Sequence, residues 1–195
     1  MEEKHVVVTG MGIVSSIGEG IKDFRDALMQ GKSGIERLNQ TVGSEEIEIL
    51  SAPLKDFSVK DSLERINLPD EEQKRIIKMI RRMPKSIQTS VIAALQASKQ
   101  AGFSQKIADK SRCSIQVAGN NLAQSYMYET MKKFIKTDGF VSPTYGLQFF
   151  DSNFIGVLSE VLGVHGEGMT TGGASASGNV AILQAYRLIR YGIAD

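Results

Sequence analysis

The segment from residue 180 to residue 189 constrains the fold more than any other part of the chain. Its apolar residues recur at helical spacing, yet they cover more than one face of the predicted helix; they are Val180, Ile182, Leu183, Ala185, Tyr186, Leu188 and Ile189. Such a helix must be covered on more than one side. The sequence therefore predicts that this helix lies between layers of other elements.

Strand-like and helix-like segments alternate along the rest of the chain. A β-branched run at residues 6–9 predicts a buried strand, and residues 113–119 alternate like a second strand. Residues 39–69 show no clear period, so we expect loops, short strands and irregular turns there. Helical spacing and end signals predict helices at 21–30, from 70 to Pro84, and at 87–101, 122–135, 149–162 and 180–189. This alternation predicts an α/β layer fold.

Composition restricts the classes of function. With 195 residues and 42% hydrophobic content, the chain is long enough for one compact domain. The 23 Lys and Arg nearly balance the 22 Asp and Glu, so we expect no nucleic-acid partner and no membrane partner. Cys113 is the only cysteine, which excludes an internal disulfide and favours a packing role. Without a long apolar stretch, the sequence predicts a cytoplasmic protein.

Two further patterns leave alternatives open. Gly10-Met11-Gly12 follows the first predicted strand, but a dinucleotide-binding fingerprint would need a third glycine at Ser15, so a tight turn is favoured. A basic run could receive an acidic partner or simply form a solvated helix face; it comprises Lys74, Arg75, Lys78, Arg81, Arg82 and Lys85.

Gly172-Gly173-Ala174-Ser175 precedes the apolar helix and is a candidate site. Small residues allow a sharp strand-to-helix turn that exposes one hydroxyl at a helix N-terminus, where backbone N–H groups can hold a developing oxyanion. The alternative is that Ser175 or Ser177 only caps the helix. The two histidines, His5 and His165, are both poorly placed to act as a base, and the G-x-S-x-G motif of α/β hydrolases is missing.

Taken together, several segments resemble the first half of the β-ketoacyl synthase family, which has the thiolase-like fold. They are residues 6–18, 31–35, 82–83, 87–103, 141–143, 162–166 and 191–195. The resemblance implies an α/β fold of the thiolase-like type, here its N-terminal half, with a mixed sheet and helices on both faces. It also implies that residues 1–195 form an N-terminal domain without the half that carries the family's two catalytic histidines. Residues 180–189 would then lie partly bare.

The resemblance places Ser175 where condensing members of the family carry an acyl-accepting cysteine. Ala174, Ser177 and Gly178 match the flanking motif, so one residue is replaced within an intact frame. A serine hydroxyl is scarcely ionised at neutral pH, which makes Ser175 a poor acyl acceptor. Decarboxylating a malonyl thioester needs only stabilisation of the resulting enolate. Ser175 is accordingly the expected catalytic residue.

This pattern resembles the malonyl-acyl carrier protein decarboxylases of polyketide β-branching cassettes. That resemblance implies no cofactor in the chain and a substrate carried on the phosphopantetheine arm of an acyl carrier protein. Implied partners are that carrier protein, a second copy or a complementary C-terminal ketosynthase half, and a hydroxymethylglutaryl-synthase-like enzyme. Two alternatives stay open: a condensing synthase that uses Ser175, and a non-catalytic subunit or remnant like a chain-length factor.

Overall fold

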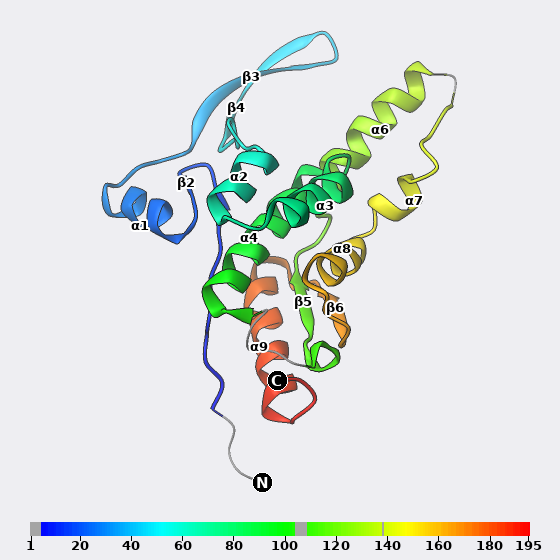
Figure 1. Ribbon diagram of the computed structural model, residues 1–195. Helices are drawn as coiled ribbons and strands as arrows, with labels where there is room; N and C mark the ends of the chain where they lie inside the picture. The colour runs from blue at the N-terminus through cyan, green and yellow to red at the C-terminus, as the bar shows by residue number, and fades with distance from the viewer. Residues whose placement is uncertain (1–4, 104–108, 138) are drawn as a thin grey trace.

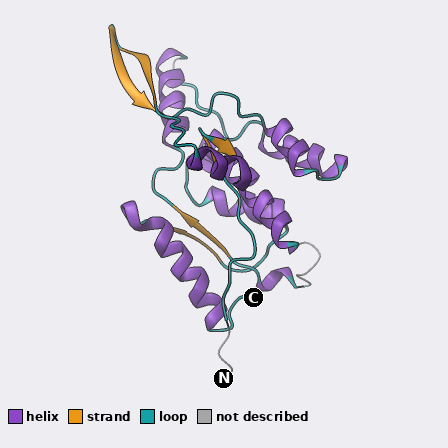
Figure 2. Ribbon diagram, turned by 90° about the vertical axis from the view of Figure 1, so that its left-hand side faces the viewer, coloured by secondary structure: helices purple, strands orange, loops and turns teal. Residues whose placement is uncertain are grey.

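A parallel pair of strands lies between helices. The computed structural model describes residues 5–103, 109–137 and 139–195. β5 (Ile115–Ala118) pairs in parallel with β6 (Gly168–Thr171), so that Ile115 lies opposite Gly168 and Ala118 opposite Thr171. α8 (Asn153–Leu162) packs on β5 and on α4 (Lys85–Ala101), while α9 (Ser177–Arg190) packs on both strands (Figures 1 and 2).

Alternate residues of β5 show that α8 and α9 cover opposite faces of the strand pair. Ile115 and Val117 contact the apolar cluster that α4 and α8 build. Gln116 points the other way and lines a small cavity with Gln184 and Leu188 of α9. Because successive side chains of a strand alternate between its faces, β5 separates two helical layers. The predicted α/β architecture with helices on both faces is confirmed.

The apolar core lies where α2 (Val59–Ile66), α3 (Asp70–Ile80), α4 and α8 meet. Acidic residues occupy the first turn of α3, where the helix dipole favours them, and α4 ends at Gly102 in the left-handed conformation (φ 66°). Each fully buried aliphatic or aromatic side chain contributes about 1.5–3 kcal/mol. The largest such side chains are Leu63, Ile76, Ile80, Ile87, Val91, Ile92 and Phe154.

Most predicted helices are confirmed with small shifts at their ends. α1 covers Ile21–Met29 and α6 covers Gln124–Lys136. The helix predicted at 149–162 begins only at Asn153, and the short α7 (Tyr145–Gln148) precedes it. β6 was not predicted, because the glycines in and around it make this stretch look like a loop; they are Gly166, Gly168, Gly172 and Gly173.

The predicted buried strand at residues 6–9 and the turn at Gly10–Gly12 are wrong. The segment is unpaired, with Val7 73% and Val8 80% exposed, and the turn lies later, at residues 16–17 between β1 (Val14–Ser15) and β2 (Gly18–Glu19). Directly after this segment, the chain runs along α4, with no partner strand among the described residues. Gln100 Oε1 accepts a hydrogen bond from the Met11 amide at 2.6 Å, and Gln96 Oε1 accepts one from the Ile13 amide at 2.9 Å.

Residues 39–69 are more regular than predicted. Most of β3 (Glu36–Val42) and all of β4 (Glu45–Ser51) lie there, forming an antiparallel hairpin that projects from the body (Figure 1). Gly43 takes the positive φ (65°) that the two-residue connection requires. Ser58 starts α2, because its hydroxyl accepts the Asp61 amide at 3.3 Å. The expected short strands are present, but helix α2 was missed.

One face of α9 is bare. Ala181 is 6% exposed against the strands, whereas Ile182 is 71%, Leu183 43% and Tyr186 44% exposed. The expected partial exposure of residues 180–189 is therefore confirmed. Within the described residues, no helix is both long and apolar enough to cross a membrane.

Candidate active site at the β6–α9 turn

Ser175 lies in a sharp turn between a strand and a helix. β6 ends at Thr171, a 3₁₀ turn covers Ala174–Ala176, and α9 begins at Ser177. Ala174 has φ 47°, a left-handed conformation that is rare for a residue other than glycine. Ser175 is exposed, and its hydroxyl makes no hydrogen bond to any residue that the structure describes. The predicted turn that presents one serine is therefore present.

Backbone amides converge beside Ser175. Within the 3₁₀ turn, the Ala176 amide donates to the Gly173 carbonyl at 2.9 Å, and the Ser177 amide donates to the Ala174 carbonyl. The amides of Ala174 and Ser175 come before these bonds, so the turn gives them no acceptor. With the N-terminus of the 14-residue α9 behind them, these N–H groups can stabilise negative charge on a bound oxygen.

Neither serine acts as the ordinary helix cap. The N-cap position of α9 is Ala176, which makes no side-chain cap bond. Ser177 is buried (6% exposed), and its hydroxyl accepts from the Gly173 amide at 2.9 Å and donates to the Ala174 carbonyl at 2.7 Å. The alternative of a simple capping role for Ser175 is therefore wrong, while Ser177 ties the turn together.

Polar residues that the sequence analysis missed lie after β5, next to the start of the turn. The side-chain oxygen of Asn120, just after β5, lies 2.1 Å from where a Cβ on Gly172 would stand. The Asp151 carboxylate accepts the amides of Asn121 and Leu122, both at 2.9 Å. These groups gather because the carboxyl ends of parallel strands meet at one edge, where α/β proteins bind ligands. The signal in the sequence was the polar Asn-Asn pair that ends a strand.

The two histidines are not brought to Ser175. His165 precedes β6 whereas Ser175 follows it, and a four-residue strand separates its ends by about 13 Å. His5 lies at the start of the extended N-terminal segment, and both histidines are exposed. The described residues therefore provide the turn and its amides but no imidazole base beside Ser175.

Cys113 lies at the amino end of β5, away from the site. It is 5% exposed, and burial, reinforced by the charges of Asp195 and Asp109, raises the pKa of its thiol. A protonated, buried thiol is unreactive. The predicted packing role is confirmed.

The basic run divides into two groups. Lys74 pairs with Glu71 at 2.7 Å, Arg75 donates to the Val161 carbonyl at 3.2 Å, and Lys85 donates to the Leu54 carbonyl at 3.3 Å. Among the described residues, no ion-pair partner is found for a second group, the basic ridge of Lys78, Arg81 and Arg82. All three belong to the end of α3 or follow it directly.

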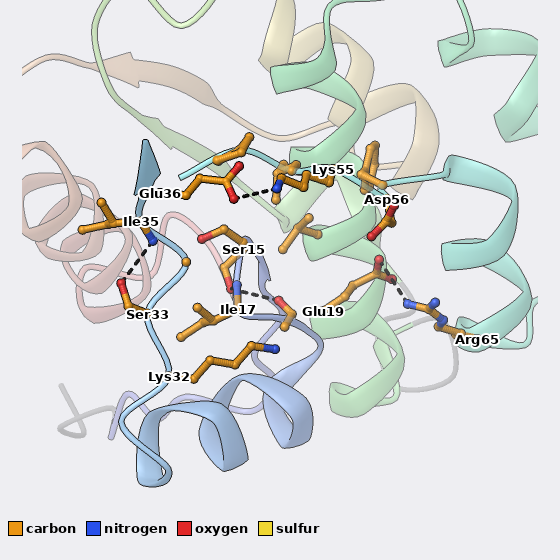
Figure 3. A pocket seen from close by; sticks show the side chains of 17 residues that line it. Ser15, Ile17, Glu19, Lys32, Ser33, Ile35, Glu36, Lys55, Asp56 and Arg65 are labelled. Carbon is orange, nitrogen blue, oxygen red and sulfur yellow. Dashed lines mark hydrogen bonds and ion pairs between the residues drawn. The ribbon is translucent and has the colours of Figure 1, made fainter. Parts of the chain in front are cut away.

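A separate polar cavity of about 390 Å³ lies between the β1–β2 turn and the base of the hairpin (Figure 3). Its charges largely neutralise each other: Lys55 pairs with Glu36 at 2.6 Å and Arg65 with Glu19 at 3.5 Å. Ser175 is not part of it. Across the described part of the chain, no group of three or more His, Cys, Asp or Glu side chains could hold a metal ion.

Comparison with known proteins agrees with this geometry. The curated relatives include the polyketide biosynthesis malonyl-ACP decarboxylase PksF of Bacillus subtilis, 30% identical over 97% of this chain and 42% of the relative. The 3-oxoacyl-(acyl-carrier-protein) synthase 2 of Staphylococcus aureus is 26% identical over 100% of this chain and 44% of the relative. The chain thus spans less than half the length of these curated relatives.

A solved structure and a family model complete the comparison. The ishigamide ketosynthase/chain length factor superposes with a TM-score of 0.77 at 22% identity, over 99% of this chain and 46% of that chain. The model of the β-ketoacyl synthase N-terminal domain matches residues 3–195. The predicted thiolase-like fold is confirmed, and the chain belongs to the β-ketoacyl synthase family.

Proposed function

We propose that the protein takes part in decarboxylating malonyl-acyl carrier protein to acetyl-acyl carrier protein, without condensation. The observation that carries the proposal is the exposed Ser175 hydroxyl in the strand-to-helix turn, at the position that the family resemblance assigns to the nucleophile. A hydroxyl there can donate a hydrogen bond but is a weak acyl acceptor at neutral pH. The 30% identity to a relative named as a malonyl-ACP decarboxylase supports the same activity.

The proposed chemistry requires little from the chain. The malonyl group arrives as a thioester on the phosphopantetheine arm, and its carbonyl oxygen accepts hydrogen bonds from the Ser175 amide and hydroxyl. The bond between the carboxylate carbon and the α-carbon breaks, CO2 leaves, and the electron pair moves onto the thioester as an enolate. The amide at the start of α9 stabilises that charge. A proton from water then reaches the α-carbon and gives the acetyl thioester.

The basic ridge is a candidate docking place for the carrier protein. Its three cations, Lys78, Arg81 and Arg82, follow one helix end, where the helix dipole adds to their stability as cations. An acidic face on the carrier protein would complement them and speed encounter. The acetyl-carrier protein formed at the site would in turn serve a hydroxymethylglutaryl-synthase-like enzyme.

The bare face of α9 supports a further part of the proposal. We assign it to a complementary C-terminal ketosynthase half, either continuous with residues 1–195 or on a separate chain. That half would cover Ile182, Leu183 and Tyr186, and its two catalytic histidines would add hydrogen-bond donors for the enolate beside Ser175. We expect two copies of this assembly to form a homodimer in solution.

The test is incubation with malonyl-acyl carrier protein, with this chain alone and together with any polypeptide that follows Asp195 in its gene. Mass spectrometry of the carrier protein should show loss of CO2, and in D2O the acetyl group should carry deuterium. A heat-denatured sample and carrier protein alone give the background. Loss of CO2 at no more than that background, with the complementary half present, would overturn the proposal.

A second candidate function is condensation, favoured by the identity to the Staphylococcus aureus synthase over the full chain. It predicts a covalent acyl ester on Ser175 after incubation with acyl-acyl carrier protein, detectable by peptide mass spectrometry. The non-catalytic alternative predicts activity that resides in a second subunit and is undiminished by Ser175→Ala, whereas the proposed function predicts a partial loss.

A further inference from the structure

The Ser177 hydroxyl lies within the turn that carries Ser175. It accepts the Gly173 amide at 2.9 Å and donates to the Ala174 carbonyl at 2.7 Å. Because Ser177 is 6% exposed, water hardly competes for either bond. One side chain therefore joins the first residue of α9 to the two residues that precede Ser175.

The bond to Ala174 fixes more than Ala174. A trans peptide unit is planar, so the Ala174 carbonyl and the Ser175 N–H point in opposite directions within one rigid plane. A donor that holds this carbonyl on the inside of the turn directs the Ser175 N–H to the outside. The Ser175 amide is the oxyanion donor in the proposed function.

The backbone conformation of Ala174 is strained and needs support from its neighbours. Ala174 has φ 47°, where the Cβ of an L-residue crowds the backbone, and such strain persists only when neighbouring contacts enforce it. The side chain of Ala174 is a methyl group, so it cannot make a hydrogen bond that would offset this strain. The Ala174 carbonyl accepts the Ser177 amide as well as the Ser177 hydroxyl. Only the hydroxyl also accepts the Gly173 amide, so it is the side-chain contact that ties both ends of this strained residue.

We propose that Ser177 is the positioning residue of this site, and that its hydroxyl holds the Ala174–Ser175 peptide so that the Ser175 amide faces a bound thioester. The inference rests on the proposed function for its catalytic meaning. The orientation of the peptide, however, can be measured without any substrate.

The measurement uses Ser175→Cys as a reporter. A thiol at this position should have its pKa lowered by the outward amide and by the N-terminus of α9, and its alkylation rate reports the thiolate fraction. The parent chain supplies the background, because its only cysteine, Cys113, is buried. Rates are followed with iodoacetamide between pH 5 and pH 10.

The decisive comparison is Ser177→Thr against Ser177→Val, each combined with Ser175→Cys. The two side chains have nearly the same shape, but only threonine keeps the hydroxyl. We expect the valine variant to be alkylated roughly tenfold more slowly at pH 7 than the threonine variant, with the midpoint of its pH profile moved upward. Ser177→Ala should behave as valine does.

Ser90→Ala is the matched control, since it removes a serine hydroxyl that donates to the Ser86 carbonyl at 2.8 Å within α4. It should leave the reporter's profile unchanged. Coincident profiles for the threonine and valine variants would overturn the inference, as would an equal effect of Ser90→Ala.

The two proposals fail separately. If the thiol series behaves as expected while malonyl-acyl carrier protein loses no CO2, the positioning role stands and the proposed function falls. If decarboxylation is measured, Ser177→Val should lower kcat relative to Ser177→Thr with KM unchanged. Decarboxylation combined with coincident thiol profiles would remove only the positioning role.

Discussion

Gly12 lies so close to Ala93 that a Cβ on Gly12 would stand 1.9 Å from the Ala93 carbonyl oxygen. A Cβ on Gly10 would stand 2.1 Å from the Ala97 carbonyl oxygen, one turn along α4. Neither glycine has a positive φ, so neither is needed for a turn. These glycines allow the N-terminal segment to lie directly on the backbone of α4, which explains them without a dinucleotide.

Replacing Gly12 by alanine should destabilise the protein. The added methyl group meets a helix carbonyl that cannot move without disturbing α4, and overpacking of this kind costs about 1–3 kcal/mol. Gly156→Ala is the control, because Gly156 is exposed in α8 with nothing within 4 Å of the added Cβ, and it should stabilise by about 0.5–1 kcal/mol. Urea unfolding of both variants measures the difference. Similar midpoints for the two would contradict this account of α4.

The sequence was a good guide where local signals determine structure. α3 and α4 were predicted because prolines and glycines mark their ends and apolar residues mark their faces. The strand at residues 6–9 was predicted wrongly because β propensity alone does not supply a pairing partner, and no strand of the described residues pairs with this segment. The amides of Met11 and Ile13, which follow it, bond to glutamine side chains of α4 instead.

In the candidate site, too, the features set by local sequence were predicted and those set by tertiary contacts were not. Ser175 and its turn follow from four small consecutive residues before a helix. The inward hydroxyl of Ser177 could not be distinguished from a cap by sequence, since both roles use a serine at a helix start. The approach of Asn120 to Gly172 depends on the pairing of β5 with β6, and that pairing joins strands about 50 residues apart.

Two neighbouring residues of α9 should respond oppositely to a charge. Ala181→Glu places a carboxylate where the side chain is 6% exposed, which should cost more than about 2 kcal/mol of stability. Ile182→Glu, at 71% exposure, should change the stability of this chain by less than about 0.5 kcal/mol. Thermal unfolding of the two variants tests this difference in stability.

Under the proposed function, Ile182→Glu should also abolish copurification with a complementary C-terminal half, even though it leaves the stability of this chain nearly unchanged. Unchanged copurification would count against the assignment of the bare α9 face to that half.

The buried thiol of Cys113 should make stability depend on pH at the alkaline end. Burial raises its pKa in the folded protein, so its contribution is intact below the unfolded thiol's pKa, about 8.5, and is lost as pH rises through the folded value. Above pH 8.5 the stability of the parent chain should therefore fall more steeply than that of Cys113→Ala. Chemical denaturation at half-unit steps from pH 7 to pH 10 compares the slopes. Parallel slopes would show that the thiol titrates normally when folded.

Reversing the charges of the basic ridge should weaken binding of an acidic carrier protein. Arg81→Glu combined with Arg82→Glu removes two attractions and adds two repulsions, so we expect at least a tenfold loss of affinity at low salt. The loss should shrink as salt screens the charges. Lys133→Glu, an exposed change on α6, is the control and should have little effect. Titration calorimetry with malonyl-acyl carrier protein at two salt concentrations measures all three proteins, and equal losses for ridge and control would exclude the ridge as the docking place.

Ser175→Cys should convert the site from decarboxylation alone toward acyl transfer. The turn around residue 175 is intact, and a thiol beside the free amides and the N-terminus of α9 is readily ionised, so the missing acyl acceptor would be restored. With the complementary half present, acyl-acyl carrier protein should acylate the variant at residue 175, whereas the parent chain should remain unmodified.

Ser175→Ala should not be acylated and should keep part of the decarboxylation, because the amide donors remain while the hydroxyl is lost. Intact-protein mass spectrometry separates these outcomes. A stable acyl ester on the parent chain would instead identify the protein as a condensing synthase that works with serine.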